Sequence, residues 1–254
     1  MPNTRRDGKP QAPRSLHGKV AHELGLRIIR GLYPPGAVVP NETEFSSRQR
    51  VSRTAYREAL KLLTAKGLIG SRARAGTRVR APFDWNMFDP DLLAWKFEAG
   101  IDEDFMRMLL EMRHVIEPSA AAIAARHRTG HDLARLRQTC AALAGPHRTC
   151  DDMVECDVQF HFSILAATQN PFMTSLASLI RTALAGAFRF ASAVDSDATE
   201  FTTAAEHAAV LRAIERQDPK AAYRAMEVII QLARGSLTKW AEGDSRRAVR
   251  SRAR

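Results

Sequence analysis

The spacing of hydrophobic residues predicts helices along most of the chain. In the first third, apolar residues recur at helical spacing over 16–31 and again over 52–66. Between these stretches, Asn41 is followed three residues later by Glu44, which is the spacing of a capping box at the start of another helix. Residues 68–80 break the helical pattern, because glycines punctuate an arginine-rich segment and favour a short hairpin. Three helices followed by a hairpin predict a winged helix-turn-helix.

The remainder of the chain again has the pattern of helices. Alanine and leucine dominate, and runs of β-branched residues are few. We expect helices near 91–99, 102–127, 131–144, 149–168, 171–193, 199–217 and 219–241. The predicted fold is therefore mainly α, with an N-terminal winged helix-turn-helix and a C-terminal all-α helical bundle.

The expected domain boundaries follow from these elements and from local composition. Both ends of the chain are polar and rich in arginine, which is typical of disordered tails. The predicted division is an N-terminal tail at 1–15, a winged helix domain at 16–81, a linker at 82–90, a helical domain at 91–241 and a basic tail at 242–254.

The formal charge of +10 is distributed unevenly along the 254 residues. The first 82 residues hold 17 lysines and arginines against 5 acidic residues, a net charge of +12. The net charge is −5 over 83–241 and +3 over 242–254. The excess therefore lies in the predicted winged helix domain and favours a polyanion as its partner. A generally basic surface with two disordered tails is the alternative.

Composition argues against a membrane protein, a secreted protein and a disulfide-stabilised scaffold. No apolar run approaches the roughly 18 residues that span a bilayer, so we expect no membrane partner. The polar segment 1–18 lacks the apolar core of a secretory signal. The three cysteines, Cys140, Cys150 and Cys156, have no C-x-x-C spacing. This sparse set is not a disulfide scaffold and fits a reducing cytoplasm.

The third predicted helix has the pattern of a DNA-recognition helix. Arg53 and Arg57 are four residues apart and share one face, which Lys61 extends. Apolar residues occupy the opposite side, so the basic face is left for phosphates and guanine edges. Thr54, at the start of the helix, can hydrogen-bond a phosphate.

The hairpin adds further positive charge beside that helix. Arg72, Arg74 and Arg78 can follow the adjacent DNA backbone or the minor groove. A solvated basic helix is the alternative interpretation, but the helix and hairpin together favour DNA binding.

The same segment resembles the GntR family of bacterial transcription regulators over roughly residues 16–80. The resemblance is carried, in the family's order and spacing, by Leu32-Tyr33-Pro34-Pro35-Gly36, Pro40-Asn41-Glu42, Val51-Ser52-Arg53-Thr54, Arg57-Glu58-Ala59-Leu60, Leu63, Lys66-Gly67-Leu68-Ile69 and Gly76-Thr77-Arg78-Val79. It implies that Arg53 and Arg57 contact an operator and that a wing at 70–79 reaches the flanking groove.

One position departs from the family's pattern within this domain. Thr43 stands where a DNA-contacting arginine is often found, and Arg48 or Arg50 is the nearby candidate to compensate. The candidate DNA-binding residues are therefore Arg48, Arg50, Ser52, Arg53, Thr54, Arg57, Arg72, Arg74, Gly76, Thr77 and Arg78.

A possible metal site lies in the predicted helical domain. Asp157 and His161 are four residues apart and share a helix face, and His207 lies on a later helix beside Glu206. A carboxylate and an imidazole so placed can bind one divalent cation. An ordinary surface Asp–His contact is the alternative, and spacing alone favours it.

Residues 91–240 resemble the FCD ligand-binding domain of the FadR subgroup. The motifs are Glu111-Met112-Arg113, Glu117-Pro118, Asp157 with Phe160-His161, Asn170-Pro171, His207 with Ala213-Ile214, and Ala225-Met226. The resemblance implies metal ligands at Asp157, His161 and His207. It also implies that Arg113 grips an effector carboxylate, which suits its planar fork. The candidate effector-binding residues are Arg113, Asp157, His161, Asn170 and His207.

One expected metal ligand is missing. In metal-binding members the fourth ligand is a histidine three residues after the methionine, and Ile229 occupies that position here. Isoleucine cannot coordinate a metal. Two interpretations stay open: a divalent metal (Zn, Ni or Mn) held by the other three ligands, waters and the effector's oxygens, or a pocket that has lost the metal and binds its effector with Arg113 and the histidines.

The resemblance predicts a cytoplasmic homodimer, with 91–241 as its effector-binding and dimerisation domain, that binds double-stranded operator DNA and regulates transcription without being an enzyme. We expect a repressor that is released by a small organic or sugar acid. The segment from Trp85 to Trp95 also resembles a stretch found in regulators of sugar-acid catabolism. Two alternatives stay open: a metal-dependent hydrolase or isomerase that uses Asp157, His161 and His207, and a non-specific, nucleoid-type DNA binder.

Overall fold

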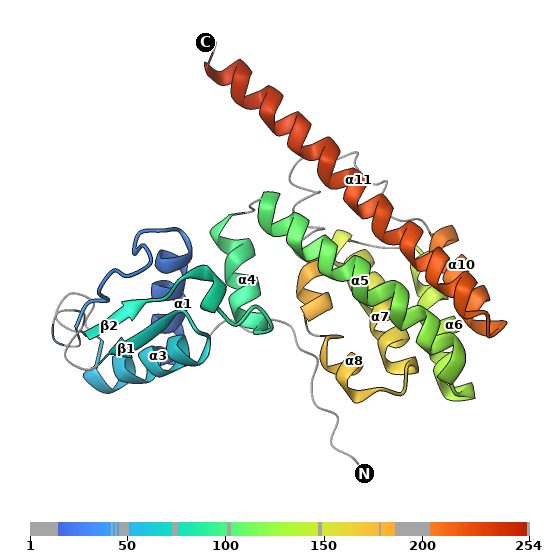
Figure 1. Ribbon diagram of the computed structural model, residues 1–254, viewed down its shortest axis with the longest axis horizontal. Coiled ribbons are helices and arrows are strands. Elements are labelled where there is room, and N and C mark those ends of the chain that lie inside the picture. The colour runs from blue at the N-terminus through green and yellow to red at the C-terminus, as the bar shows by residue number, and fades with distance from the viewer. Residues whose placement is uncertain are drawn as a thin grey trace. The chain divides into compact units, whose positions relative to one another are not determined.

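A computed structural model describes residues 15–41, 43, 45, 51–72, 76–100, 103–146, 149–177, 179–185 and 204–252. The side chains of Arg72, Cys150, Asp151 and residues 236–252 lie outside that description. The chain divides into two compact units, Met1–Gly100 and Ile101–Arg254, and each is described by itself (Figure 1).

Two capped helices dominate the N-terminal unit: α1 (Leu16–Ile29) and α3 (Arg53–Ala65). Ser15 and Ser52 each accept a hydrogen bond from the backbone N–H three residues further on, at 3.2 Å. Gly67 follows the end of α3 with a φ of 78°, a left-handed conformation that favours glycine. Both helices lie where the hydrophobic pattern predicted them.

The predicted second helix is described only at Thr43 and Phe45, which are both helical. The backbone N–H of Phe45 donates to the carbonyl of Asn41 at 3.0 Å, a helical hydrogen bond that begins at the predicted cap. The Phe45 ring stacks on Tyr56 of α3, with the ring centroids 4.4 Å apart. Both rings are buried, so this pair fixes the described part of the segment against α3.

The hairpin predicted over 68–80 is confirmed. Strands β1 (Ile69–Arg72) and β2 (Gly76–Val79) are antiparallel, and Ile69 lies opposite Val79. These two side chains are buried in the same core as the helices, which anchors the base of the hairpin. Arg72 lies opposite Gly76 at the other end of the hairpin, whereas Arg78 lies opposite Gly70, next to the base.

The N-terminal unit extends further along the chain than the sequence predicted. It includes a 3₁₀ turn, η1 (Pro82–Asp84), and the helix α4 (Pro90–Ala99). The Trp95 ring of α4 lies over Gly25 of α1, so closely that a Cβ added to that glycine would lie 2.5 Å from the ring. Because Trp95 is part of the N-terminal core, the assignment of α4 to the helical domain is corrected.

A buried cation also holds α4 in the N-terminal unit. Lys66, directly after α3, donates to Asp89 at 2.7 Å and to Asp91 at 2.8 Å. Its ammonium group also lies 5.1 Å from the centroid of the Trp95 ring. These partners compensate the cost of burying the lysine, and they tie the end of α3 to the start of α4.

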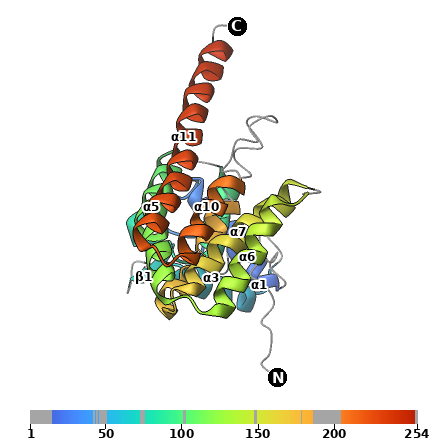
Figure 2. The same ribbon diagram turned by 90° about the vertical axis from the view of Figure 1, so that its right-hand side faces the viewer.

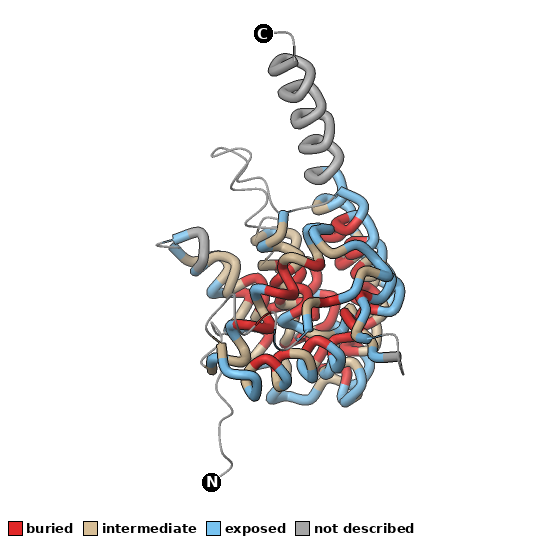
Figure 3. Tube along the Cα trace, turned by 90° about the vertical axis from the view of Figure 1, so that its left-hand side faces the viewer, coloured by how far each residue is buried: buried red, intermediate tan, exposed pale blue. Residues whose placement is uncertain are grey.

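Every secondary-structure element described in the C-terminal unit is a helix. Its named helices are α5 (Glu103–His127), α6 (Gly130–Ala144), α7 (Cys150–Ala167), α8 (Pro171–Ser175), α10 (Ala204–Glu215) and α11 (Pro219–Arg252). Two perpendicular views show α5 and α11 side by side (Figure 1, Figure 2). Buried and exposed residues alternate along the tube (Figure 3). The buried residues of this unit build one core from α5, α6, α7, α10 and α11, together with Ala177, Ile180 and Leu184.

Two helices end elsewhere than the sequence predicted. The helix expected over 171–193 is interrupted at Leu176, after which residues 177 and 179–185 are helical. At the C-terminus, α11 continues to Arg252, which corrects the disordered tail expected from 242. Residues 242–252 contain no proline, and their arginine, alanine and glutamate residues are good helix formers, so a helix that already exists can extend through them.

No helix among the described residues is both long enough and apolar enough to cross a membrane.

Candidate DNA interface and metal centre

The basic residues predicted to meet DNA lie on the exposed side of α3. Arg53, Thr54, Arg57 and Lys61 are all exposed. The other side of the helix is buried through Tyr56, Ala59 and Leu63. The Tyr56 hydroxyl donates to the carbonyl of Pro40 at 2.5 Å. The core thus holds one side of α3 and leaves its basic side exposed, as a recognition helix requires.

The wing is described in part. The hydroxyls of Thr77 and Ser71 lie 3.2 Å apart across the strands, and Gly76 has a φ of 74°. Arg78 is exposed, and its Nη1 donates to the carbonyl of Gly36 at 2.7 Å. Arg78 therefore braces the turn around Gly36, an internal role that the sequence did not suggest.

Several predicted DNA-binding residues fall outside what the structure describes. Arg48, Arg50 and Arg74 are outside the described residues altogether. Arg72 is described only as backbone in β1. Their contacts with DNA stay predictions, as do those of Arg53 and Arg57.

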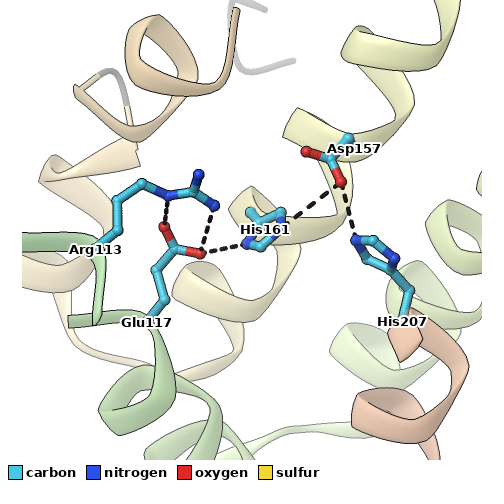
Figure 4. A network of polar contacts seen from close by, with 5 residues as sticks. All are labelled: Arg113, Glu117, Asp157, His161 and His207. Carbon is cyan, nitrogen blue, oxygen red and sulfur yellow. Dashed lines mark hydrogen bonds and ion pairs between the residues drawn. The ribbon is translucent and has the colours of Figure 1, made fainter. Parts of the chain in front are cut away.

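In the C-terminal unit, α7 and α10 bring the predicted metal ligands together. A capping box between Thr149 and Asp152 begins α7 and sets its register. Asp157 and His161 then lie one turn apart on that helix, and His207 comes from α10 (Figure 4).

These three side chains form a compact buried cluster. His207 Nε2 is hydrogen-bonded to Asp157 Oδ1 at 2.9 Å, and His161 Nε2 lies 3.7 Å from the same oxygen. One potential ligand atom from each residue lies within 4.8 Å of the others. All three are buried, so the alternative of an ordinary surface Asp–His contact is wrong.

A second buried pair adjoins the cluster through His161. Arg113 and Glu117 are one turn apart on α5, and Arg113 Nε donates to Glu117 Oε1 at 2.5 Å. The Nη2 group donates to Oε2 at 3.3 Å. That oxygen also lies 2.5 Å from His161 Nδ1, at an ion-pair distance without hydrogen-bond geometry (Figure 4). The five side chains therefore form one continuous buried network.

Glu117 is the member of this network that sequence analysis missed. Its motif was noted, but no role was given to it. The four-residue spacing from Arg113 was a visible signal for an ion pair. The contact with His161, however, joins two helices and cannot be read from either one.

The charges of the network stabilise one another. Burial alone would raise the pKa of Glu117, but Arg113 and His161 outweigh it and lower that pKa to about 2. Burial would also raise the pKa of Asp157, but His161 and His207 outweigh it and lower that pKa. Burial would lower the pKa of Arg113, but the charges of Glu117 and Asp157 raise it. Two carboxylates and one guanidinium are thus held ionised in the interior.

The donor set fits a divalent metal. Both ring nitrogens of His161 are buried without a hydrogen-bond partner, which is unusual for buried polar atoms. Coordination through Nε2 would satisfy one of them. One carboxylate and two imidazoles are ligands that Zn, Ni and Mn accept, and three protein ligands leave positions open. Asp157, His161 and His207 can therefore hold a metal ion.

Two further positions of the predicted site, Ile229 and Asn170, lie in surroundings unlike those of the three clustered ligands. Ile229 is buried in the hydrophobic core, so it supplies packing where a fourth ligand was expected. Asn170 caps α8, and its Oδ1 accepts a hydrogen bond from the backbone N–H of Phe172 at 3.0 Å. Its described contact is therefore structural, and its predicted effector contact stays untested.

Comparisons with known proteins agree with both units. The model of the bacterial regulatory proteins of the gntR family matches residues 16–79, and that of the FCD domain matches residues 108–232. An uncharacterized HTH-type transcriptional regulator of Escherichia coli K12, YieP, is 34% identical over 87% of this chain and 94% of its own. The galactonate operon transcriptional repressor of the same strain is 29% identical over 84% of this chain and 92% of its own.

A solved structure shares the fold. It is that of Lar, which controls the expression of the Listeria monocytogenes agr system. The TM-score is 0.63 at 16% sequence identity, and the match covers 90% of this chain and 99% of that one. At this identity the match shows the fold alone, and the family rests on the family models and the relatives. The chain therefore belongs to the GntR family of bacterial transcription regulators, in the group that carries an FCD domain, and it is a DNA-binding regulator rather than an enzyme.

Proposed function

We propose that this regulator is a homodimeric repressor that leaves its operator when a small carboxylic or sugar acid binds beside a metal ion in the C-terminal unit. The observation that carries the proposal is the buried cluster of Asp157, His161 and His207 in a chain whose α3 exposes Arg53 and Arg57. The exposed arginines of α3 suit DNA, and a metal ion held by the buried cluster would suit a small carboxylate.

The DNA contacts are assigned to the exposed face of α3. Arg53 and Arg57 are within reach of guanine edges and phosphates when the start of the helix enters the major groove. Ser52 caps the helix, and Thr54 follows it as a phosphate donor. A homodimer would place two such helices on two half-sites of a pseudo-palindrome.

The metal site is assigned to Asp157, His161 and His207, with Glu117 as a positioning residue. Glu117 contacts His161 on its Nδ1 side, which directs Nε2 toward Asp157 and His207. Carboxylates often orient metal-binding histidines in this way. A bound cation would supply a positive charge that attracts and polarises a carboxylate oxygen.

Arg113 is assigned a second contact with the effector. Glu117 engages its Nε and Nη2, so Nη1 is the guanidinium nitrogen that we assign to the effector's carboxylate. A local cation of this kind is needed, because residues 83–241 carry a net charge of −5 and do not attract anions by their general field. The relative that represses a galactonate operon supports a sugar acid as the class of effector.

Binding experiments test the two parts in sequence. Random double-stranded DNA is first selected with the purified full chain to obtain a preferred sequence. Binding is then measured by fluorescence anisotropy with ZnCl₂, NiCl₂ or MnCl₂ and a panel of aldonates and uronates. We expect one acid to lower the affinity for DNA only when a metal is present.

The same experiments separate the alternatives. A sequence selection that yields no preference over competitor DNA would contradict operator recognition. Release by an acid in metal-free, chelator-treated protein would contradict the metal's role but keep the repressor. An acid that strengthens DNA binding would contradict release as the mode of regulation.

A further inference from the structure

Helix α11 continues well beyond the core of the C-terminal unit. Ile230 is its last buried residue among those whose side chains the structure describes, and the match to the FCD domain ends at residue 232. The helix nevertheless runs on to Arg252, and two perpendicular views show its end continuing past the other named helices of this unit (Figure 1, Figure 2). We call residues 233–252 the α11 arm, which is about 30 Å long at the rise of an α-helix.

The α11 arm has the opposite charge to the part of the unit that precedes it. The arm holds six lysines and arginines against two acidic residues, Glu242 and Asp244, which is a net charge of +4. Residues 101–232 hold 13 lysines and arginines against 17 acidic residues, a net charge of −4. The preceding part therefore repels a nucleic acid by its general field, whereas the arm attracts one.

Four of the cations in the arm follow one side of the helix. Lys239, Arg246 and Arg250 are separated by seven and four residues, so they succeed one another along that side, and Arg247 adjoins them. We call these four residues the basic stripe, which extends over about 16 Å of helix. Duplex DNA carries one negative charge per about 1.7 Å of its axis, so a stripe of this length meets several phosphates.

The register of α11 separates the basic stripe from the side of the helix that packs on the core. Arg246 and Arg250 come 18 residues, or five helical turns, after Val228 and Leu232, which are both exposed. The apolar residues of the arm instead continue the buried side of α11, and they are Leu237, Trp240, Ala241 and Ala248. The arm is therefore amphipathic, with its cations and its apolar residues on different sides.

Stabilisation of the helix end does not account for these cations. Basic side chains favour a helix C-terminus through the helix dipole, but that effect is confined to about the last turn. The last turn of α11 is 249–252, and Lys239, Arg246 and Arg247 all precede it. Only two acidic residues lie within the arm, so pairing inside it leaves four of its six cations over. An anion from outside the arm accounts for the stripe.

We propose that the basic stripe of the α11 arm binds the phosphate backbone of double-stranded DNA, as a sequence-independent contact in addition to that of the recognition helix α3. DNA is the occupant because this chain belongs to a family of DNA-binding regulators, and because an extended stripe of cations fits a row of phosphates better than one compact anion. In this arrangement α3 supplies sequence preference, and the arm adds affinity that is equal for every sequence. The proposal goes beyond the repressor and effector proposed above and depends on neither.

The salt dependence of DNA binding tests this contact. The stripe variant of the full chain carries Arg246→Gln, Arg247→Gln and Arg250→Gln. Its affinity for the selected sequence and for a random duplex is measured by fluorescence anisotropy between about 50 and 200 mM KCl. We expect the slope of log K against log salt concentration to become shallower by about 2–3 for each bound arm, because each phosphate contact contributes about 0.9. The affinities for the two duplexes should fall by the same factor, which leaves their ratio unchanged.

A control variant separates the stripe from net charge. It carries Arg126→Gln, Arg216→Gln and Lys220→Gln, and it thus loses the same charge from exposed positions of the same unit outside the arm. Its slope should change by less than one phosphate contact, about 0.9. Circular dichroism of each variant checks that its helix content is that of the wild type.

A second variant tests whether charge alone makes the contact. Arg246→Lys with Arg247→Lys and Arg250→Lys keeps three cations at the same positions, and lysine also neutralises phosphates. We expect this variant to retain the wild-type slope. A slope as shallow as that of the stripe variant would contradict a contact with phosphates.

The remaining outcomes also decide the proposal. A folded stripe variant with the wild-type slope overturns it, and so does an equal change in the control variant. A loss of affinity confined to the selected sequence overturns the sequence-independent contact. Weaker binding to a single-stranded RNA of equal length, with DNA binding unchanged, assigns the stripe to another polyanion and overturns the proposal.

Failure of the proposed function gives a different result. A selection that yields no preferred sequence contradicts operator recognition, whereas the random duplex still reports the slope that the basic stripe contributes. If the stripe variant does not fold, Arg250→Gln alone provides the same test. Its slope should become shallower by about 0.9 for each bound arm, and an unchanged slope overturns the proposal.

Discussion

The two units of this protein treat their charged residues in opposite ways. In the N-terminal unit, Arg53, Arg57 and Lys61 lie on the exposed side of α3. In the C-terminal unit, Arg113, Glu117 and Asp157 are buried with two histidines. Exposed charges are screened by solvent and act together on an extended polyanion. Buried charges must satisfy one another or a bound ion, so they define a small and specific site.

From this comparison we expect the largest loss of stability when one member of the buried ion-pair network is removed. Glu117→Ala leaves Arg113 without its carboxylate and His161 without its neighbour, and we expect a loss of about 3–5 kcal/mol in the free energy of unfolding of the C-terminal unit. Urea denaturation followed by circular dichroism measures this loss.

Glu111→Ala is the matched control for that variant. Glu111 is also on α5 and is also paired with an arginine, Arg107 at 2.9 Å, but it is exposed. Its removal should change the urea midpoint little, because exposed ion pairs contribute little to stability. Equal losses in the two variants would contradict the distinction between buried and exposed charge.

Removal of a bound metal is expected to cause the next largest loss of stability, and only in the C-terminal unit. A cation that binds the folded cluster at 100 times its dissociation constant stabilises it by about 2.7 kcal/mol. We expect ZnCl₂, NiCl₂ or MnCl₂ to raise the melting temperature of chelator-treated protein and His207→Ala to abolish the rise. His131→Ala, at an exposed histidine of α6, should retain it. No rise with any of the three metals would contradict the metal site.

On the N-terminal unit, single substitutions should alter DNA binding without altering the fold. Arg53→Ala and Arg57→Ala are each expected to lower affinity for the selected DNA sequence by about 1–3 kcal/mol. Fluorescence anisotropy at fixed salt measures the change. Arg137→Ala, at an exposed arginine of the C-terminal unit, should have no effect on affinity. Unchanged binding by both α3 variants would remove α3 as the recognition helix.

A core substitution tests the attachment of α4 to the N-terminal unit, with an expected effect no larger than that of the α3 variants. Gly25→Ala places a methyl group 2.5 Å from the Trp95 ring, and overpacking of this kind costs about 1–3 kcal/mol unless the ring moves away. We expect lower stability and a changed tryptophan fluorescence. Gly130→Ala, where nothing lies within 4 Å of the added methyl group, is the control. A stable Gly25→Ala variant with unchanged fluorescence would contradict the close packing of α4.

Local features account for what could be predicted of the fold. The periodicity of α3, its Ser52 cap and the glycine after it lie within about 15 residues of one another. The helices of the C-terminal unit were located from the same kind of signal. Their ends were less certain, because a residue such as Leu176 or Arg252 does not by itself decide whether a helix stops.

Contacts between distant residues account for what could not be predicted. α4 was assigned to the wrong unit because its place depends on the packing of Trp95 on Gly25, which lie 70 residues apart. The pairing of Arg78 with the carbonyl of Gly36 was missed for the same reason.

The sequence by itself determined which residue types the chain offers: a basic, capped helix suited to a polyanion, and an aspartate and a histidine one helical turn apart, a spacing that by itself favours a surface contact over a cation site. Those properties reside in residue types and in spacings along single helices. Only the tertiary structure decided that Asp157, His161 and His207 meet in the interior and that Glu117 joins Arg113 to them. The reason is that burial and the convergence of three helices set the strength of each charge, and neither is a property of a single helix.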